Sequence, residues 1–347
     1  MSMTIIEERD SSRYEESLRK FPASPFIAPA WLESFRTSRR QPIYFRFVSG
    51  GTTVGGIAGL ILEPSSALLR KINRPIFFFS GPVGHQPDQE FIPACIQSLI
   101  QHATLNGYTS VQFNSWDYPY VCNMGNGHFC METREEFIVN LRREFTDIRK
   151  AMRRMVKSKV KKAEECGLTF HESDAPDLIA ELVSLLEETR AIRRAKGYED
   201  YSYYYISYLD KEVILQLMLN KIARIFYVKE NETILCAQLT AAYGQRAYGL
   251  VMGSKDRGYE LGANALLWYR IIERFQQEGY ATLNLGGVAN DGGTSGLTFF
   301  KTSLGAEPCA CMGGSTVYLQ GVLRNLIRQL YYRKLSFKTI NGFLTRG

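Results

Sequence analysis

The chain has 347 residues, of which 45% are hydrophobic and 22% are charged, and its formal net charge is +7. This composition is that of a soluble globular protein and excludes a disordered chain, while the length allows two domains with separate cores. No stretch approaches the roughly 18 consecutive apolar residues of a membrane-spanning helix, and the polar N-terminus lacks the apolar segment of a signal peptide. We therefore expect a cytoplasmic protein.

The seven cysteines are scattered along the chain and lack the paired spacing of a zinc site. Cys309-x-Cys311 and the Cys122/Cys130 pair, even with His128 nearby, supply too few ligands for a metal cage. We expect reduced, mostly buried thiols, with no metal and no bound cofactor.

The first half is predicted to contain four strands and one helix. Apolar alternation, interrupted at Ser49-Gly50-Gly51, indicates a hairpin over residues 43–62. Further strands are expected at 76–79 and 110–114, with a helix at about 89–105 between them.

A strongly basic segment follows. Residues 142–162 hold ten Lys and Arg against two acids, and apolar side chains recur among them at steps of three and four. This spacing predicts one amphipathic linker helix over about 142–166, ending at Gly167. A second helix is expected at about 176–196, and a tyrosine-rich loop and the start of another helix follow it.

The cations of the linker helix allow three interpretations. They could contact the phosphates of tRNA, hold a nucleotide-linked or lipid-linked pyrophosphate, or form a solvated face. The candidates for contact with tRNA or another polyanion are Lys150, Arg153, Arg154 and Lys157. The basic C-terminal segment 322–335 could likewise lie on an anionic membrane surface or pack on its own domain.

The second half repeats the order of the first. Strands are expected at 224–228, 234–242 and 247–251, a helix at about 262–277 and a strand at 282–285. A shift of 172 residues superimposes Gly107-Tyr108 on Gly279-Tyr280 and aligns the apolar positions around them. The predicted fold class is α/β (α+β): two tandem domains, 1–140 and 141–347, with mixed sheets flanked by helices and a cleft between the domains.

The segment SKDRGYELGANALL, residues 254–267, leads from a predicted strand into a helix. It resembles the acyl-CoA loop of the GCN5-related N-acetyltransferases (GNAT), in which glycines let backbone N–H groups approach a pyrophosphate at a helix N-terminus. The resemblance implies a phosphate contact for Arg257 and a donor loop at Gly262 and Ala263. Glu260 stands where the family has its first glycine, and a carboxylate there repels a pyrophosphate. A helix-entry loop without a ligand is the alternative.

A second resemblance extends over residues 130–310. "NLGGV" followed by "GLTFFKTSLGAEP" looks like the C-terminal signature of the Fem family of aminoacyltransferases, which are tandem GNAT proteins. "FIVNLRREFTDIRKAMRRMVKSKVKKAEECGLTF" is similar to the inter-domain segment of that family, and "ALLWYRIIERFQQEGYATLNLGGV" to its last helix and strand. Each motif is weak alone, and their order makes the resemblance more specific.

The resemblance implies roles for four residues. In the family the lysine of the "FK" motif serves the transition state and the substrate phosphates, which points to Lys301 as a catalytic cation. Tyr248 matches a tyrosine near the reacting groups, and Arg190 and Arg193 match the region that holds substrate phosphates. The alternatives are a lysine on a half-buried strand with its amine in solvent, a core tyrosine and a solvated group of arginines.

These observations predict a monomeric enzyme, an acyltransferase or aminoacyltransferase that forms amide bonds. The leading version moves an amino acid from aminoacyl-tRNA to the amine of a peptidoglycan precursor, at or near the inner face of the membrane. The alternatives are an N-acyltransferase that uses acyl-CoA or another acyl thioester on an envelope or exopolysaccharide sugar or other small molecule, and a non-catalytic phosphate- or RNA-binding protein. No general base is evident, because loop aspartates such as Asp256 and Asp291 are usually turn formers.

Overall fold

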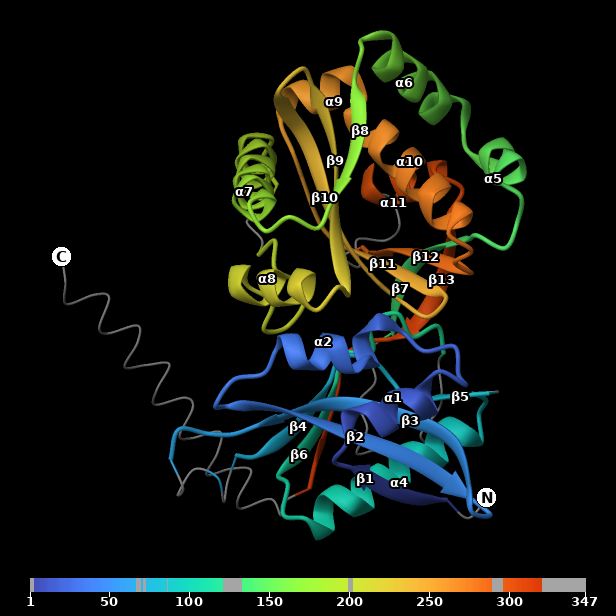
Figure 1. Cartoon of the computed structure of the whole chain (residues 1–347), viewed down its shortest axis with the longest axis vertical. Coiled ribbons are helices and arrows are strands. Elements are labelled where there is room, and N and C mark those ends of the chain that lie inside the picture. Colours follow the sequence, from blue (N-terminus) through green and yellow to red (C-terminus); the bar gives the residue numbers. More distant parts are fainter. Residues whose placement is uncertain are drawn as a thin grey trace, which may run out of the picture.

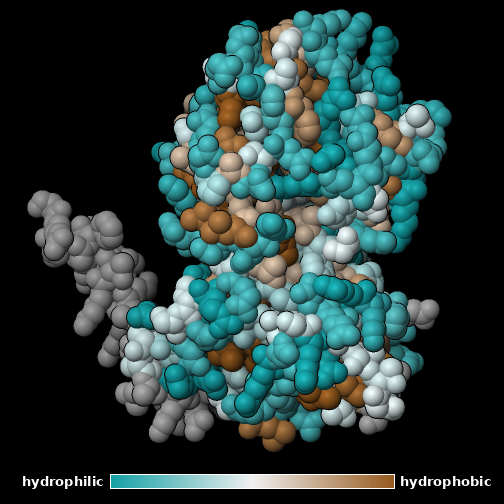
Figure 2. Space-filling model, in the orientation of Figure 1, coloured by the Kyte–Doolittle hydropathy of each residue, from teal (hydrophilic) through white to brown (hydrophobic). Residues whose placement is uncertain are grey.

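The computed structural model describes residues 3–66, 70, 73–85, 87–120, 133–198, 202–288 and 296–319. Its strands form two sheets of seven strands each, which lie one above the other along the long axis of the molecule (Figure 1). Figure 2 shows a narrowing where the two halves meet. Helices flank both sheets, which confirms the predicted fold class. The segment 322–335 and Asp291 lie outside the described residues.

The first sheet is built around the predicted hairpin. β2 (Arg40–Ser49) and β3 (Thr52–Leu62) pair antiparallel and turn at Gly50 and Gly51, whose φ angles of 56° and 79° favour glycine. The other members are β1 (Thr4–Glu8), β4 (Pro75–Phe78), β5 (Val83–Gly84), β6 (Ser110–Phe113) and β14 (Ser315–Tyr318). The order is β1-β2-β3-β4-β6-β14, with β5 beside β3. β4 and β6 confirm the strands predicted at 76–79 and 110–114.

Helices cover both faces of this sheet. Successive side chains of a strand point to opposite faces, so Tyr44 packs in one core and Phe45 in another. α4 (Phe91–Leu105) covers the Phe45 face and confirms the helix predicted there. The opposite face is covered by helices that the sequence patterns did not indicate, namely α1 (Ser11–Leu18), the 3-10 helix η1 (Pro25–Ile27) and α2 (Pro29–Ser34).

Two neighbouring strands of the second sheet, β11 (Arg246–Ser254) and β12 (Thr282–Gly287), are paired over only part of their length. In order, the sheet consists of β13 (Glu307–Met312), β7 (Thr133–Asn140), β12, β11, β10 (Thr233–Tyr243), β9 (Ala223–Glu230) and β8 (Thr169–Ser173). β11 and β12 are parallel, and their ladder runs only from Arg246 to Tyr248 on β11 and from Thr282 to Asn284 on β12. The later residues of both strands lie outside this ladder.

Helices also cover both faces of the second sheet (Figure 1). α10 (Ala263–Gln277) confirms the predicted helix and shares one core with α6 (Arg154–Glu165). α7 (Leu178–Ala195) and α8 (Lys211–Leu219) cover the other face, where their apolar side chains join those of α1 and α2 in a single core. This common core packs the two halves against each other. The remaining helices near the site are α5 (Phe145–Ala151), α9 (Asp256–Leu261) and α11 (Gly296–Ser303).

The single linker helix predicted over 142–166 is wrong. α5 and α6 are separate helices, because Met152 and Arg153 have extended backbones with ψ angles of 139° and 150°. The Arg153 N–H donates to Ser303 O of α11 at 2.9 Å. This tertiary hydrogen bond replaces a hydrogen bond within the helix at the break. The apolar spacing of the sequence therefore could not reveal that the helix is interrupted here.

Two strands cross the predicted domain limit at residue 140. β7 precedes that limit, yet it pairs with β12 and β13 of the second sheet. β14 comes from the end of the described chain, yet it pairs with β6 of the first sheet. Sheet membership therefore departs from the limits 1–140 and 141–347 at these two strands, since strand pairing is decided by contacts distant in sequence.

Candidate active site

A cavity of about 550 Å³ lies where β11 and β12 leave their ladder. Both strands line it, together with side chains from α7, α10, α11 and the loop 202–205. The lining is mainly apolar and includes the cationic side chains of Lys301, Arg134 and Arg193. This size and this mixture of apolar walls with a few charged groups are typical of sites for small molecules.

Lys301 lies in the last turn of α11 and is only 7% exposed. Its Nζ donates hydrogen bonds to Gly286 O and Gly287 O, both at 2.8 Å. Burial lowers the pKa of this ammonium to about 7, although the negative charge of Glu136 acts in the opposite direction. Two of its three donor positions thus point at carbonyl oxygens, and within the described part of the chain the third is left for a group in the cavity. The alternative of a solvent-facing lysine on a strand is excluded.

Several polar groups meet around Gly286, at the end of β12. Its φ of 76° is in the left-handed region that favours glycine, and its N–H donates to the Asn284 side-chain oxygen at 2.8 Å. A Cβ placed on Gly286 would lie 3.4 Å from the Tyr248 hydroxyl, 3.6 Å from the Tyr205 hydroxyl and 3.7 Å from Lys301 Nζ. Two phenols and an ammonium therefore surround one turn of backbone.

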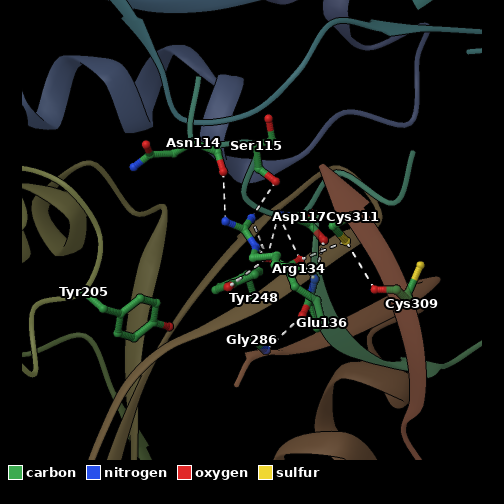
Figure 3. Close-up of polar contacts among 12 residues, drawn as sticks. Asn114, Ser115, Asp117, Arg134, Glu136, Tyr205, Tyr248, Gly286, Cys309 and Cys311 are labelled. Atoms are coloured by element: carbon green, nitrogen blue, oxygen red, sulfur yellow. Dashed lines mark hydrogen bonds and ion pairs between the residues drawn. The ribbon is translucent and has the colours of Figure 1, made fainter. Parts of the chain in front are cut away.

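The two tyrosines differ in their relation to the cavity. Tyr205 lines it, and its hydroxyl donates to Gly249 O at 3.2 Å, so the hydroxyl points inward although the residue is 42% exposed. Tyr248, from β11, is fully buried behind the wall, with its hydroxyl 3.5 Å from Glu136 Oε1 (Figure 3). Burial raises the pKa of both phenols, and both remain neutral hydrogen-bond donors at neutral pH.

A buried polar network lies next to these tyrosines (Figure 3). Glu136 is completely buried on β7, and its carboxylate accepts hydrogen bonds from Arg134 Nε at 3.1 Å and from the Asn284 amide at 2.7 Å. The Asp117 N–H also donates to it at 3.1 Å. Burial raises the pKa of Glu136, and the positive charge of Arg134 partly offsets that shift. Arg134, the Asn284 amide and the Asp117 N–H thus stabilise the charge of this carboxylate, while the negative charge of Asp117 acts against it.

The same network joins the two halves of the molecule. Arg134 donates to Asn114 O at 2.9 Å and to Ser115 O at 2.6 Å, and its guanidinium stacks 3.7 Å from the Trp116 ring centroid. Asp117, from the same loop of the first half, pairs with Arg246 of β11 at 2.7 Å. A loop that follows β6 therefore supports the wall of a cavity in the second sheet.

The three arginines expected at substrate phosphates lie in different places. Arg193, on α7, lines the cavity, and its guanidinium carbon lies 4.7 Å from the Tyr198 ring centroid. Arg190 is half-buried one turn earlier on α7, outside the described lining. Arg257 is on α9, also outside that lining, and forms ion pairs with Glu230 at 3.1 Å and Glu260 at 3.7 Å. A phosphate at Arg257 would have to displace these carboxylates.

The predicted donor loop has a packing explanation. Gly262 joins α9 to α10 with a φ of 80°, and a Cβ there would lie 2.7 Å from Lys159 O of α6. Ala263 is fully buried at the start of α10. The glycine is thus needed for the close approach of α6, and the phosphate role of this loop stays a prediction.

The expected polyanion contacts lie on and between α5 and α6. Lys150 is paired with Asp147 at 2.8 Å, and Lys157 Nζ donates to Lys150 O at 3.2 Å. Arg154 is exposed, while the Arg153 guanidinium stacks 4.7 Å from the ring centroid of Phe299, on α11. Figure 2 shows a largely hydrophilic surface over the end of the molecule that carries α6. This surface is available to a polyanion, and contact with one stays a prediction.

Sequence reasoning missed most of the network. The sequence patterns place Tyr205 only within a tyrosine-rich loop, and they do not single out Arg134, Glu136 or Asn284. A signal was present: Glu136 precedes the apolar run Phe137–Val139, and Asn284 interrupts the apolar strand Leu283–Leu285. A charged or amide side chain inside a buried strand needs polar partners and so indicates a site or a structural network. Those partners lie far away in sequence.

The described residues include neither a candidate metal site nor a candidate membrane-spanning helix. No group of three or more His, Cys, Asp or Glu side chains among them could hold a metal ion. In the same part of the chain, none of the helices combines the length and apolarity needed to cross a membrane.

The family described as acetyltransferase (GNAT) domain matches residues 150–301. The matched region includes the cavity strands β11 and β12, the helices α7 and α10, and Lys301 at its last position. A search of curated proteins found no match. The GNAT domain and the acyltransferase class expected from the sequence are thereby confirmed.

Solved structures resemble nearly the whole chain. FemX superimposes with a TM-score of 0.68 at 14% identity, over 95% of this chain and 99% of FemX. L-PGS from Bacillus licheniformis gives 0.52 at 16% identity, over 92% of this chain and 96% of that one. A conserved protein of unknown function from Bacteroides thetaiotaomicron gives 0.53 at 14% identity, with 90% and 97% covered. At these identities the likeness concerns the fold, and it includes both sheets.

Proposed function

We propose that this GNAT-type acyltransferase joins an acyl carbonyl to an amine in the cavity beside Lys301. The observation that carries the proposal is the buried ammonium at the cavity wall, held by two backbone carbonyls. A cation fixed in this way meets the negative charge that develops on the carbonyl oxygen without reorganising during the reaction. Groups of this kind commonly lower the barrier by about 3 kcal/mol.

The reaction forms one amide bond and breaks one ester or thioester bond. The amine nitrogen bonds to the carbonyl carbon, and the carbonyl oxygen becomes an oxyanion that faces Lys301 Nζ. Collapse of this intermediate breaks the bond from carbon to the leaving oxygen of an ester or the leaving sulfur of a thioester. The amine proton leaves with that group. The phenols of Tyr205 and Tyr248 are neutral hydrogen-bond donors near Gly286, so neither of them takes the proton of the attacking amine.

For the substrates, the leading version is transfer of an amino acid from aminoacyl-tRNA to the amine of a peptidoglycan precursor. The fold shared with FemX supports this version. The cations of α5 and α6 also support it, since an exposed basic surface suits tRNA phosphates. In this version Arg193, at the cavity wall, binds a phosphate of the acceptor, and the protein acts as a monomer at the inner face of the membrane.

An acyl thioester is the second candidate donor. The match to the acetyltransferase (GNAT) domain favours it, because such enzymes take acyl-CoA as a substrate. The ion pairs of Arg257 with Glu230 and Glu260 weigh against a pyrophosphate at the usual loop. A thioester with a smaller carrier avoids this conflict.

Transfer assays with each donor separate these versions. With aminoacyl-tRNA as donor, RNase treatment of the charged tRNA abolishes product, and a product yield indifferent to RNase removes the leading version. With acyl-CoA, product forms without RNA, and free CoA raises the melting temperature. A non-catalytic binding protein gives no product with either donor, and its ligand affinity is the same after Lys301→Ala.

A further inference from the structure

Apolar, well-buried side chains form one part of the cavity lining, which is called the apolar end below. Trp268 and Leu285 are each 5% exposed, and Leu304 is fully buried. A Cβ on Gly249 would lie 2.6 Å from the Trp268 Cη2 atom, so this ring lies directly against β11. All four residues belong to the lining. Apolar atoms that reach this end leave water and gain affinity by about fourfold for each methylene buried.

The polar groups around the apolar end are engaged with the protein itself. Thr189 Oγ1 donates to Ser254 O at 3.0 Å and accepts the Ser254 N–H at 2.7 Å. The Gln238 amide donates to Leu239 O at 2.6 Å. These contacts tie the Thr189 and Gln238 side chains to backbone groups, so the surface that these two residues leave to a ligand is more apolar than their composition suggests.

Among the described residues, the charged side chains of the lining are positive. Lys301, Arg134 and Arg193 face the same cavity from α11, β7 and α7. Glu136 compensates Arg134 from behind the wall, where it is completely buried. A further cation brought inside such a cavity meets repulsion that weakens binding by about tenfold or more for each close pair.

We infer that the group transferred in this cavity is an aliphatic or aromatic acyl group whose side chain carries no positive charge. The inference rests on the proposed function and specifies the substrate class of the same site. The acyl carbonyl lies at Lys301, and the side chain enters the apolar end between Trp268, Leu285 and Leu304. A simple aliphatic acyl group satisfies this arrangement, and an apolar aminoacyl group satisfies it with its α-amine in the neutral form, whereas the side-chain ammonium of a lysyl or ornithyl group does not.

A pair of carboxylates of equal size tests the inference without knowledge of the donor. Heptanoate and ω-aminohexanoate have the same number of heavy atoms and differ only in a terminal methyl or ammonium group. Trp116 and Trp268 line the cavity, while Trp31, the third tryptophan, is fully buried outside that lining and gives a constant background. Titration of the full chain, followed by tryptophan fluorescence, should show heptanoate binding at least about tenfold more tightly.

Three variants locate the effect. Arg193→Gln removes one lining charge and should narrow the ratio between the two ligands, because less repulsion acts on the terminal ammonium. Arg13→Gln removes an equal charge from α1, where the side chain is 75% exposed, and should leave the ratio unchanged. Trp268→Phe should reduce the fluorescence change, which confirms that the ligand occupies this end.

Equal binding of the two carboxylates, tighter binding of ω-aminohexanoate, or no binding of heptanoate each overturns the inference. A failure of this inference can be distinguished from a failure of the proposed function. Selective binding of heptanoate without amide formation from any donor contradicts the proposed function and leaves the ligand class standing. Amide formation that is as fast with a cationic acyl group as with an aliphatic one contradicts the ligand class and leaves the function standing.

Discussion

The Asn284 side chain accepts the Gly286 N–H at 2.8 Å, and the Gly286 carbonyl accepts a hydrogen bond from Lys301 at the same distance. Asn284 is fully buried, and its amide donates to Asp117 and Glu136 on the other side. One side chain therefore links the buried network to the turn that positions the ammonium. Asn284 acts on the reaction through Lys301, as a positioning residue.

Asn284→Ala should lower kcat more than it raises KM. The turn at Gly286 loses its anchor, and a small displacement of a catalytic group costs up to about a hundredfold in rate. The buried partners left without a hydrogen bond cost about 1–3 kcal/mol of unfolding free energy. Steady-state kinetics and thermal melts measure both effects. Asn140→Ala removes an amide that contacts only an exposed backbone N–H in the described contacts, and should change neither quantity appreciably.

Lys301→Met should abolish most of the transfer activity while the protein stays folded. Methionine has a similar length and suits the apolar surroundings, but it supplies no charge to the oxyanion, so we expect a fall of about a hundredfold or more. Lys20→Met makes the same change at an exposed position of the first half. A Lys301→Met enzyme with a rate close to that of the Lys20→Met control contradicts the role of this ammonium.

The activity should depend on pH through Lys301. Its pKa of about 7 lies below the ordinary 10.5, and the cationic form is the one that stabilises an oxyanion. The transfer rate should therefore fall as the pH rises through about 7. In Lys301→Arg, the remaining activity should show no such fall, because arginine stays charged. A rate that rises through this pH in the wild type but not in Lys301→Arg would show instead that the neutral amine of Lys301 acts as a base.

Stability should respond to the same titration in the opposite sense. Between pH 7 and 10.5 the unfolded chain binds a proton at this position that the folded chain has released. The contribution of Lys301 to the free energy of unfolding therefore rises with pH across this window, and it is lowest below pH 7, where burial acts on the charged form. Denaturant melts of the wild type and Lys301→Met at several pH values isolate this contribution as their difference.

Glu136→Gln should shift the pH dependence of the rate to lower pH. The negative charge of Glu136 raises the pKa of Lys301, and its removal leaves burial unopposed. Weakening of the pair with Arg134 should also cost about 1–3 kcal/mol of unfolding free energy. Glu135→Gln changes the neighbouring exposed carboxylate and serves as the control. An unshifted profile in an enzyme that is destabilised would assign Glu136 a purely structural role.

Gly262→Ala should destabilise the protein through two effects. A φ of 80° strains any residue with a Cβ, and that Cβ would also meet Lys159 O at 2.7 Å. Gly244→Ala carries only the first effect, because a Cβ there has no atom within 4 Å, at a φ of 56°. The difference between the two melting temperatures therefore reports the contact with α6. If the donor KM of a folded Gly262→Ala enzyme is unchanged, the loop has a packing role; a large increase supports the donor loop.

Sequence patterns predicted the elements whose signals are local. The period of the α10 side chains, the glycine turn between β2 and β3 and the apolar run of β12 each act within a few residues, and all three appear close to their predicted positions. The order of these elements also sufficed to predict two sheets flanked by helices and a GNAT domain. The same patterns placed Lys301 after a glycine-rich turn, where the cavity is found.

The rest depended on contacts between residues that are distant in the chain. The pairing of β7 with β12, and of β14 with β6, is decided by which edges remain free once the other strands have paired. The break between α5 and α6 depends on Ser303, about 150 residues further along. Glu136, Asn284 and Tyr205 act at the site only because the fold brings them to Gly286, and a buried polar group is explained by its partners in space. Local patterns thus determined the elements, and tertiary packing decided which side chains meet around the ammonium of Lys301.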